Sequence, residues 1–300
     1  RQSSRCRSGA PVKLAERAPA KVNLSLRIVG RREDGYHLLD SLVGFAWGAH
    51  DDVTLDPGPR LSLTVEGPTA GEAGCGQDNL AMRAARALLE RREGLRAGAF
   101  HLDKRLPVAA GLGGGSADAA AALRLIARAN DMAPDDPVLF DAARATGADV
   151  PVCLASRLRV MRGIGDELGP AMAAEPLYAV LANPRVACPT GAVFRALGAP
   201  IGSGFATADH RTPMPSQDDD PVRRLVAERN DLEAPALRLV PVIGDVLAAL
   251  RGLDGCAVAR MSGSGATCFA LFDNRDAAAQ AARGLRRDRP EWWIAETSIA

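Results

Sequence analysis

The stretch LPVAAGLGGGSADAAAALRLI, residues 106–126, places four glycines and a serine in six positions directly before an alanine-rich run. Glycine loses more backbone entropy on folding than any other residue, so such a cluster indicates a sharp bend or a ligand against the backbone. Bare N–H groups at a helix N-terminus, aided by the helix dipole, bind oxyanions. We therefore predict a phosphate-binding turn at 111–116 followed by a helix. A tight strand-to-helix packing turn is the alternative.

Length, charge and composition exclude several classes of protein. The chain has 300 residues and a formal net charge of +1, and no apolar run approaches the roughly 20 residues of a membrane-spanning helix. The near-neutral charge lacks the footprint of a nucleic-acid-binding protein. Six cysteines and four histidines are scattered, which predicts neither a disulfide framework nor a zinc site. We expect a cytoplasmic protein, a monomer or weak homodimer, with no nucleic acid and no membrane as partner.

The pattern of elements predicts a mixed α/β (α+β) fold in two halves. Residues 1–17 are expected as a flexible arm, 18–170 as a first domain and 171–300 as a second. The segment 148–168 is expected as a turn and a hairpin. A stretch rich in Gly, Pro and Asp at about 198–221 is expected as a surface loop.

The common nucleotide-binding turns are absent from the sequence. The pattern G-x-G-x-x-G fails because Ser116 stands where the third glycine is needed, no lysine follows a glycine, and neither H-R-D nor D-F-G occurs. The pattern that remains, P-x-A-A-G-L-G-G-G-S-A-D-A before a helix, resembles the phosphate loop of the GHMP kinases. These are small-molecule kinases named for galactose, homoserine, mevalonate and phosphomevalonate.

Four other segments resemble the same family, in family order. They are PAKVNLSLRIVGRREDGYHLLDS (19–41), GADVPV (147–152), NDLE (230–233) and MSGSGATCFALF (261–272). The resemblance implies the two-domain GHMP kinase fold, with a left-handed βαβ unit in the N-terminal domain and a ferredoxin-like C-terminal domain.

One departure from the family pattern follows GADVPV. Where the family usually has an aromatic residue and then a glycine, this chain has Cys153, Ala155 and Ser156. We expect a slightly altered hairpin beneath the site and no loss of activity.

The resemblance implies two catalytic residues. Phosphoryl transfer to an alcohol depends on positioning, on charge stabilisation and on a base that accepts the hydroxyl proton. By resemblance, Asp149 is that base, and Lys21 lies beside it and contacts substrate and phosphate. The alternative for Asp149 is a turn residue that closes the helix-to-strand connection after Gly147.

ATP with Mg²⁺ is the cofactor that the resemblance implies. The expected ATP-binding residues are Asn79, Lys104, Pro107, Val108, Ala109, Ala110, Gly111, Leu112, Gly113, Gly114, Gly115 and Ser116. Ser116 could instead cap the helix or contact Mg²⁺, and no other protein ligand for the metal is assigned. Ser262, Gly263, Ser264 and Gly265 form a second glycine turn that could contact the same phosphates, and a simple turn between two strands is the alternative.

The substrate that the resemblance implies is a small molecule, cytidyl diphosphate methylerythritol, of the non-mevalonate isoprenoid pathway. Tyr36 and Phe194 would stack on the cytosine, His37 would hydrogen-bond to it, and Asn23 and Thr190 complete the set. Tyr36 as a half-exposed strand residue and Phe194 as the apolar side of a short helix are the alternatives. A GHMP kinase for another alcohol, of the mevalonate or homoserine type, and a non-catalytic nucleotide- or RNA-binding module also stay open.

Overall fold

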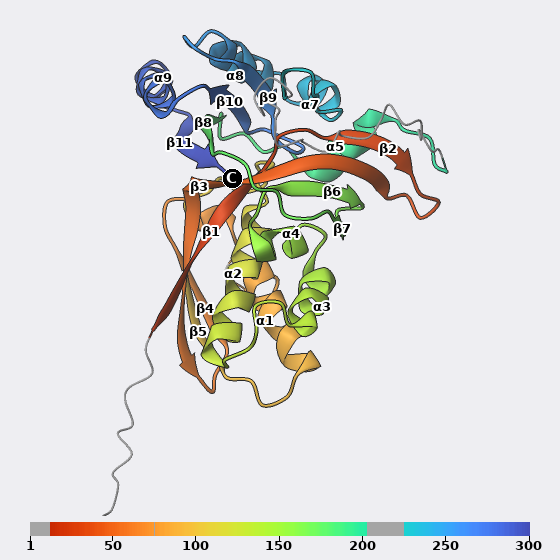
Figure 1. Cartoon of the computed structure of the whole chain (residues 1–300), viewed down its shortest axis with the longest axis vertical. Helices are drawn as coiled ribbons and strands as arrows, with labels where there is room; N and C mark the ends of the chain where they lie inside the picture. The colour runs from red at the N-terminus through yellow and green to blue at the C-terminus, as the bar shows by residue number, and fades with distance from the viewer. Residues whose placement is uncertain (1–12, 75, 203–224) are drawn as a thin grey trace, which may run out of the picture.

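The structure is a computed structural model that describes residues 13–74, 76–202 and 225–300. These residues form a mixed sheet that runs through both halves of the chain, with helices packed against it in each half (Figure 1). The α/β architecture that the sequence predicts is therefore confirmed.

The first half is built around one long strand, β3 (His37–Gly58). Its other elements are β1 (Leu14–Asn23), β2 (Arg27–Arg31), β4 (Ser62–Glu66), the 3-10 helix η1 (Ala70–Glu72), α1 (Leu80–Arg91), β5 (Ala97–Asp103), α2 (Gly114–Ala129), α3 (Pro137–Thr146), α4 (Val150–Ala155), β6 (Arg159–Gly163) and β7 (Glu167–Leu168). β3 pairs antiparallel with β1, β2, β5 and β6, whereas β4 and β5 are parallel. Since α1 connects these parallel strands, β4, α1 and β5 form a βαβ unit. Its left-handed crossover stays a prediction.

Helix α2 lies at the centre of the first half. Its alanines and leucines are buried on nearly every side, and it packs against β1, β3, α1 and α4. A helix that is apolar all round belongs in a core, and small alanine side chains let neighbouring elements approach closely. This packing fixes the N-terminus of α2, and with it the glycine turn.

Two sequence predictions for the first half are wrong. β1 begins at Leu14, so residues 14–17 are strand rather than loose arm, because they pair with β3; residues 1–12 lie outside the described residues. The chain after Asp149 forms α4 instead of continuing extended, because its buried side chains pack against α2 and α3. Tertiary packing here overrides the strand preference of its valines. The expected hairpin occurs further on, as β6 and β7.

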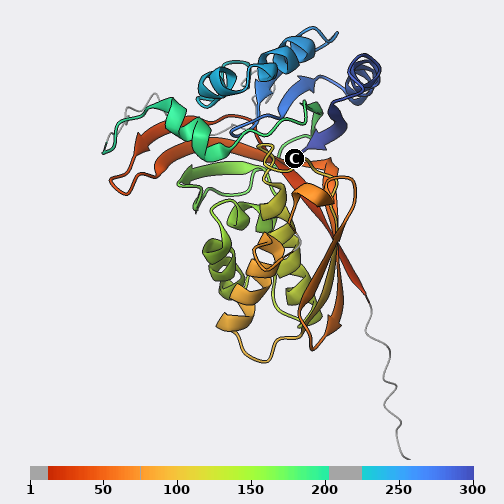
Figure 2. The same cartoon turned by 180° about the vertical axis from the view of Figure 1, so that it is seen from behind.

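The second half contains β8 (Leu177–Asn183), α5 (Thr190–Leu197), α7 (Glu233–Leu239), α8 (Val242–Arg251), β9 (Val258–Met261), β10 (Cys268–Phe272), α9 (Arg275–Asp288) and β11 (Trp293–Ile299). Its strands lie in the order β11-β8-β10-β9, with α7, α8 and α9 on one side of them (Figure 2). The chain order β-α-β-β-α-β with antiparallel neighbours is the ferredoxin-like arrangement. The loop expected at 198–221 lies mostly outside the described residues, and its described part, 198–202, is neither helix nor strand.

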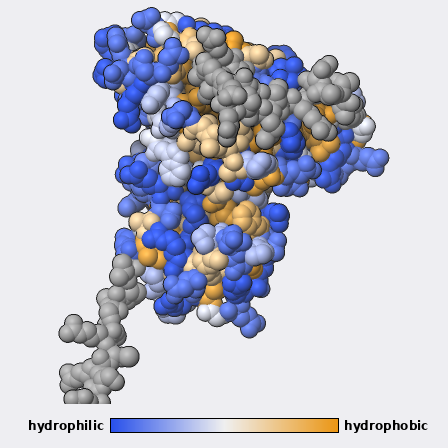
Figure 3. Space-filling view, viewed as in Figure 1, coloured by the Kyte–Doolittle hydropathy of each residue, from blue (hydrophilic) through white to orange (hydrophobic). Residues whose placement is uncertain are grey.

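The surface of the molecule is mostly hydrophilic where Figure 3 shows it. On this face hydrophobic residues occur in separate patches. Within the described residues, no helix has both the length and the apolar character needed to cross a membrane.

Candidate active site

A cleft of about 1020 Å³ brings together segments from both halves of the chain. Its volume is that of a site for a small-molecule ligand. The expected site residues that line it are Lys21, Asn23, Tyr36, His37, Asn79, Lys104, Pro107, Val108, Ala109, Ala110, Gly111, Gly113, Gly114, Gly115, Ser116, Asp149, Thr190, Phe194, Gly263 and Ser264. Three others, Leu112, Ser262 and Gly265, are not on its wall.

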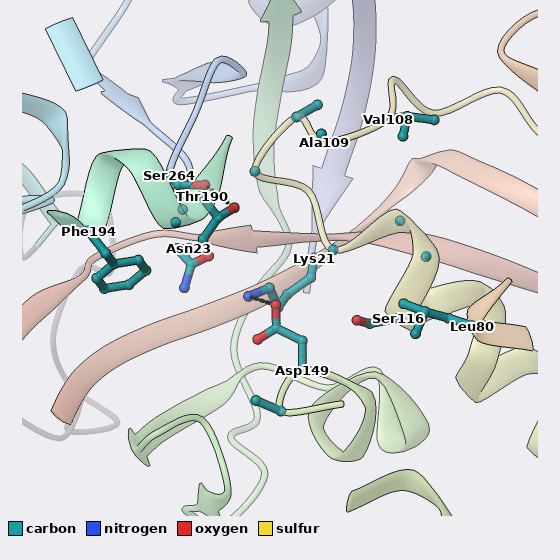
Figure 4. Close-up of a pocket in the computed structure, with 18 of the residues that line it drawn as sticks. Lys21, Asn23, Leu80, Val108, Ala109, Ser116, Asp149, Thr190, Phe194 and Ser264 are labelled. Atoms are coloured by element: carbon teal, nitrogen blue, oxygen red, sulfur yellow. Dashed lines mark hydrogen bonds and ion pairs between the residues drawn. The ribbon is translucent and has the colours of Figure 1, made fainter. Parts of the chain in front are cut away.

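The glycine turn leads directly into α2 along one side of the cleft. Gly113 is the N-cap residue, with a φ of +59° that favours glycine, and Gly114, Gly115 and Ser116 form the first helical turn. The N–H groups of that turn have no partner within the helix. Because Gly113 occupies the cap position, Ser116 does not cap the helix. Its side chain lies on the cleft wall (Figure 4).

The two glycine turns pack against each other. A Cβ added to Gly111 would lie 2.3 Å from the carbonyl oxygen of Ser262. The Ser262 hydroxyl donates to the carbonyl oxygen of Gly111 at 2.9 Å and accepts from the Asn23 N–H at 3.1 Å. Gly111 therefore has the packing role that was the alternative for the glycine cluster. Ser262 joins the two turns and does not line the cleft.

Leu112 and Gly265 are likewise packing residues. The Leu112 side chain is buried in a hydrophobic cluster, and its carbonyl oxygen accepts a hydrogen bond from the Lys21 N–H at 2.8 Å. Gly265 lies in the connection from β9 to β10, where its N–H donates to the Ser262 carbonyl. The second glycine turn thus connects two strands, as the alternative had it, while Gly263 and Ser264 also line the cleft.

An ion pair lies at the centre of the cleft. Lys21 Nζ is 2.9 Å from Asp149 Oδ2, with the lysine side chain buried and the aspartate side chain 36% exposed (Figure 4). Asp149 precedes α4 at its N-cap position, but its side chain accepts no capping hydrogen bond. The carboxylate is therefore directed to Lys21 and the cleft and does not close the turn. A Cβ on Gly113 would lie 3.3 Å from both Cβ and Cε of Lys21, so this glycine leaves room for the lysine.

Lys104 belongs to a buried triad that the sequence did not predict. Its Nζ lies 2.5 Å from Asp51 Oδ2 and 2.7 Å from Asp118 Oδ2. Burial lowers the pKa of Lys104, but the charges of the two carboxylates outweigh it and hold the pKa above its ordinary value; burial raises the pKa of Asp118 to about 7. Asp51 Oδ1 also accepts the N–H groups of Arg105 and Leu106. The triad thus joins β3, the segment 104–106 that leads from β5 towards the glycine turn, and α2.

Four more of the expected contact residues have structural partners. Asn79 caps α1, because its side chain accepts the Ala81 N–H at 3.0 Å. Asn23 Nδ2 donates to Ser41 Oγ at 2.8 Å, which fixes the amide from behind the cleft. The hydroxyls of Thr190 and Ser264 are 2.8 Å apart and join α5 to the second glycine turn.

Aromatic residues gather at the other end of the cleft. The rings of His37 and Phe194 have centroids 4.9 Å apart and are tilted by 36°. Tyr36, beside them on the hairpin between β2 and β3, is 61% exposed. Burial and then the charge of Arg31 lower the pKa of His37, so its ring is neutral at pH 7. The His37 Nε2 atom is buried without a hydrogen-bond partner among the described residues.

Comparison with known protein families defines the class. The model of the GHMP kinases N terminal domain matches residues 79–157, and that of the GHMP kinases C terminal domain matches 211–290. Each match lies within one of the two segments expected as domains, whose exact boundary stays a prediction. Together with the fold and the glycine turn, these matches define a GHMP kinase, an ATP-dependent kinase of small molecules.

Individual relatives define the family more closely. A protein of Methylobacterium radiotolerans named 4-diphosphocytidyl-2-C-methyl-D-erythritol kinase is 61% identical over 95% of this chain and 99% of its own length. The protein of the same name from Methylorubrum extorquens strain PA1 is 55% identical over 96% and 99%. The chain belongs to the 4-diphosphocytidyl-2-C-methyl-D-erythritol kinase family.

Solved structures agree with this assignment. A crystal structure of 4-(cytidine 5'-diphospho)-2C-methyl-D-erythritol kinase matches with a TM-score of 0.72 and 35% identity, over 96% of this chain and 99% of that one. A crystal structure of L. major mevalonate kinase in complex with R-mevalonate matches with a TM-score of 0.65 and 14% identity, over 97% of each chain. At that identity the second match shows the fold alone.

Proposed function

We propose that the chain transfers the γ-phosphoryl group of ATP to the 2-hydroxyl of 4-diphosphocytidyl-2-C-methyl-D-erythritol. The observation that carries this proposal is the place of the ion pair between Lys21 and Asp149. It lies between the start of α2, marked by Ser116, and Phe194 on α5 (Figure 4). A phosphate donor on one side and a substrate on the other would therefore meet at the ion pair. The names of the relatives supply the identity of the substrate.

Asp149 is the proposed base. Its half-exposed carboxylate can reach a ligand hydroxyl in the cleft, and one of its oxygens is already held by Lys21. As the hydroxyl oxygen attacks the γ-phosphorus, its proton passes to the Asp149 carboxylate and ADP leaves with the electrons of the broken P–O bond.

Lys21 and the turn at 111–116 would stabilise the transferring group. The ammonium of Lys21 lies 2.9 Å from Asp149, so it would be close to the oxygens of the γ-phosphoryl group as charge shifts on them. The free N–H groups of Gly114, Gly115 and Ser116 would bind the phosphates of ATP at the positive end of α2. We assign Lys104 a supporting role, because its ammonium is shared by two carboxylates.

Ser116 and Asp118 are the proposed protein oxygens near Mg²⁺. The Ser116 hydroxyl and Asp118 line the cleft, and Asp118 Oδ1 is a buried oxygen without a hydrogen-bond partner among the described residues. Such oxygens suit Mg²⁺, which otherwise keeps waters and phosphates as ligands. In the described part of the chain no group of three His, Cys, Asp or Glu side chains could hold a metal. When bound, Mg²⁺ neutralises charge on the β- and γ-phosphates.

The aromatic end of the cleft would hold the cytosine. Tyr36 and Phe194 are proposed as its stacking walls, and the neutral His37 ring offers a nitrogen as a hydrogen-bond partner. Thr190 and Asn23 would contact the remainder of the substrate, since both line the cleft and lie between Phe194 and the ion pair (Figure 4).

Release of ADP, measured with ATP and a panel of alcohols, tests the proposal. The panel contains the cytidyl substrate, mevalonate and homoserine at equal concentrations, with an assay without alcohol as the blank. We expect ADP release above the blank with the cytidyl substrate alone. Release with mevalonate or homoserine instead would refute the substrate assignment while leaving the kinase class intact.

A further inference from the structure

The two proposed walls of the base site stand on separate elements that Arg31 joins. Tyr36 lies on the hairpin between β2 and β3, and Phe194 lies on α5. Arg31 Nε donates to the carbonyl oxygen of Gly35 at 3.1 Å, and its Nη1 donates to that of Ala199, just beyond α5, at 2.9 Å. One guanidinium therefore bridges the two elements.

The main chain adds a second connection at the same place. The carbonyl oxygen of Arg31 accepts the N–H of Gly202 at 2.9 Å. Residue 31 thus contacts the segment after α5 through both its side chain and its backbone. The neighbouring hairpin turn is short, since Arg32 N–H donates to the Tyr36 carbonyl at 2.8 Å.

We propose that Arg31 is a positioning residue that sets the separation of the Tyr36 and Phe194 walls. This inference rests on the proposed function, because the walls matter only if a base lies between them. A guanidinium carries several donors in a rigid planar fork, so it can hold two carbonyl oxygens at fixed places. A lysine at this position has the same charge but no such fork and cannot hold both carbonyls in the same geometry.

The charge of Arg31 has a separate effect. The acceptors of these two hydrogen bonds, Gly35 and Ala199, are neutral carbonyls, so these contacts do not compensate the charge of Arg31. Burial has the larger effect on the pKa of His37, and the charge of Arg31 lowers it further. The guanidinium of Arg195 on α5 lines the same cleft. A lysine at position 31 keeps the positive charge but cannot make both hydrogen bonds in the same geometry, so Arg31→Lys tests the bridge without removing the charge.

The test compares Arg31→Lys with Arg32→Lys. Arg32 is the matched control, because its exposed guanidinium pairs with Asp34 in the hairpin turn and does not line the cleft. We expect Arg31→Lys to weaken binding of the cytidyl substrate about tenfold, the scale of a lost hydrogen bond to a charged group. ATP affinity and melting temperature should stay at parent values. Unchanged substrate affinity in Arg31→Lys, or an equal loss in Arg32→Lys, would overturn the proposal.

Two further measurements sharpen the test, and the second separates this inference from the proposed function. In a Phe194→Ala background, Arg31→Lys should cost much less substrate affinity, because one wall is already gone; full additivity would contradict the positioning role. Hydrogen exchange of the Gly202 amide in the enzyme without substrate should be faster in Arg31→Lys than in Arg32→Lys. This readout needs no ligand, so it still tests the bridge if the parent does not bind the cytidyl substrate, an outcome that would refute the proposed function instead.

Discussion

The two ends of the cleft are built in different ways. The phosphate end consists of backbone held in place by buried packing: the two glycine turns touch, and Asp51, Lys104 and Asp118 lock the segment that enters α2. The aromatic end consists of side chains near the surface, where Tyr36 is 61% exposed and the connection between walls passes through Arg31. Every residue except proline has a backbone N–H group that can bind a phosphate, so packing rather than side-chain identity determines the phosphate end. Particular side chains decide the second.

Asp149→Asn removes the group between the two ends and should have the largest effect. The replacement is nearly isosteric but cannot accept the proton, so we expect kcat to fall roughly 10²-fold or more. Affinity for ATP and for the substrate should stay close to parent values. Steady-state kinetics with binding measurements check this, with Asp141→Asn, an exposed change on α3, as the control. Turnover within a few-fold of the parent would remove Asp149 from the mechanism.

Truncation of either aromatic wall should weaken binding of the cytidyl substrate and leave ATP binding nearly unchanged. Tyr36→Ala or Phe194→Ala should cost about 1 to 3 kcal/mol of stacking, which is roughly a five- to 150-fold loss of substrate affinity. ATP affinity should barely move, since Phe194 lies across the cleft from Ser116 and the start of α2 (Figure 4), and Tyr36 lines the cleft next to His37, whose ring contacts Phe194. Calorimetric titration with each ligand measures both. Equal weakening of the two ligands would mean that the ends are not independent.

Gly111→Ala should damage the packing of the phosphate end. Gly111 has a φ of +76°, and its added Cβ would lie 2.3 Å from the Ser262 carbonyl oxygen, so we expect a loss of about 2 kcal/mol in the free energy of unfolding. Gly94→Ala is the matched control, with a φ of +78° and no atom within 4 Å of an added Cβ. Denaturant unfolding of both variants measures the difference. Equal losses would show that backbone strain alone, without the contact between turns, accounts for the effect.

Gly113→Val tests a different contact in the same turn. In a phosphate-binding turn the valine side chain would occupy the place of a phosphate, and the structure also puts an added Cβ 3.3 Å from Lys21. We therefore expect kcat to fall along with ATP affinity, because the lysine is displaced. Kinetics and melting temperature measured together check this; a large loss of melting temperature with unchanged kinetics would assign Gly113 to packing.

The smallest predicted effect is a pH dependence at the aromatic end. Because the pKa of His37 is lowered in the folded state, the neutral ring stabilises the fold above the ordinary value of 6.5, and this contribution is lost as the pH falls through the folded pKa. The melting temperature of the parent should therefore fall more between pH 7 and pH 5 than that of His37→Gln, which has no such titration. Parallel melting curves for the two proteins over this range would contradict the prediction.

Much of the phosphate end could be predicted from the sequence because it depends on local signals. Glycines before an alanine-rich run determine a turn and a helix start, and both occur where expected, with Gly113 as the cap. The motif residues Lys21 and Asp149 meet in one ion pair although 128 positions separate them in the sequence (149 minus 21). No local rule predicts that contact, and it followed from the family resemblance.

What the sequence did not predict depends on tertiary packing. Asp118 is buried in α2 and faces Lys104. The one available signal was its place in a run of alanines, SADAAAA (116–122), where an acidic side chain is unexpected. The segment after Asp149 was expected to be extended, and its buried packing against α2 and α3 favours the helix α4 instead. The bridge from Arg31 to Ala199 joins residues far apart in the chain and had no signal.

Strand β3 makes the two halves depend on each other for stability. It pairs with β1 and β5 in the first half, and at Ala46 it also pairs with Ile299 of β11 in the second. If either half unfolded alone, N–H and C=O groups at the edge of the sheet in the other half would lose their hydrogen-bond partners, at a cost in free energy. We therefore expect the two halves to unfold together, and a substitution that loosens the sheet in one half to reduce the population of molecules with a competent cleft, since both halves form it.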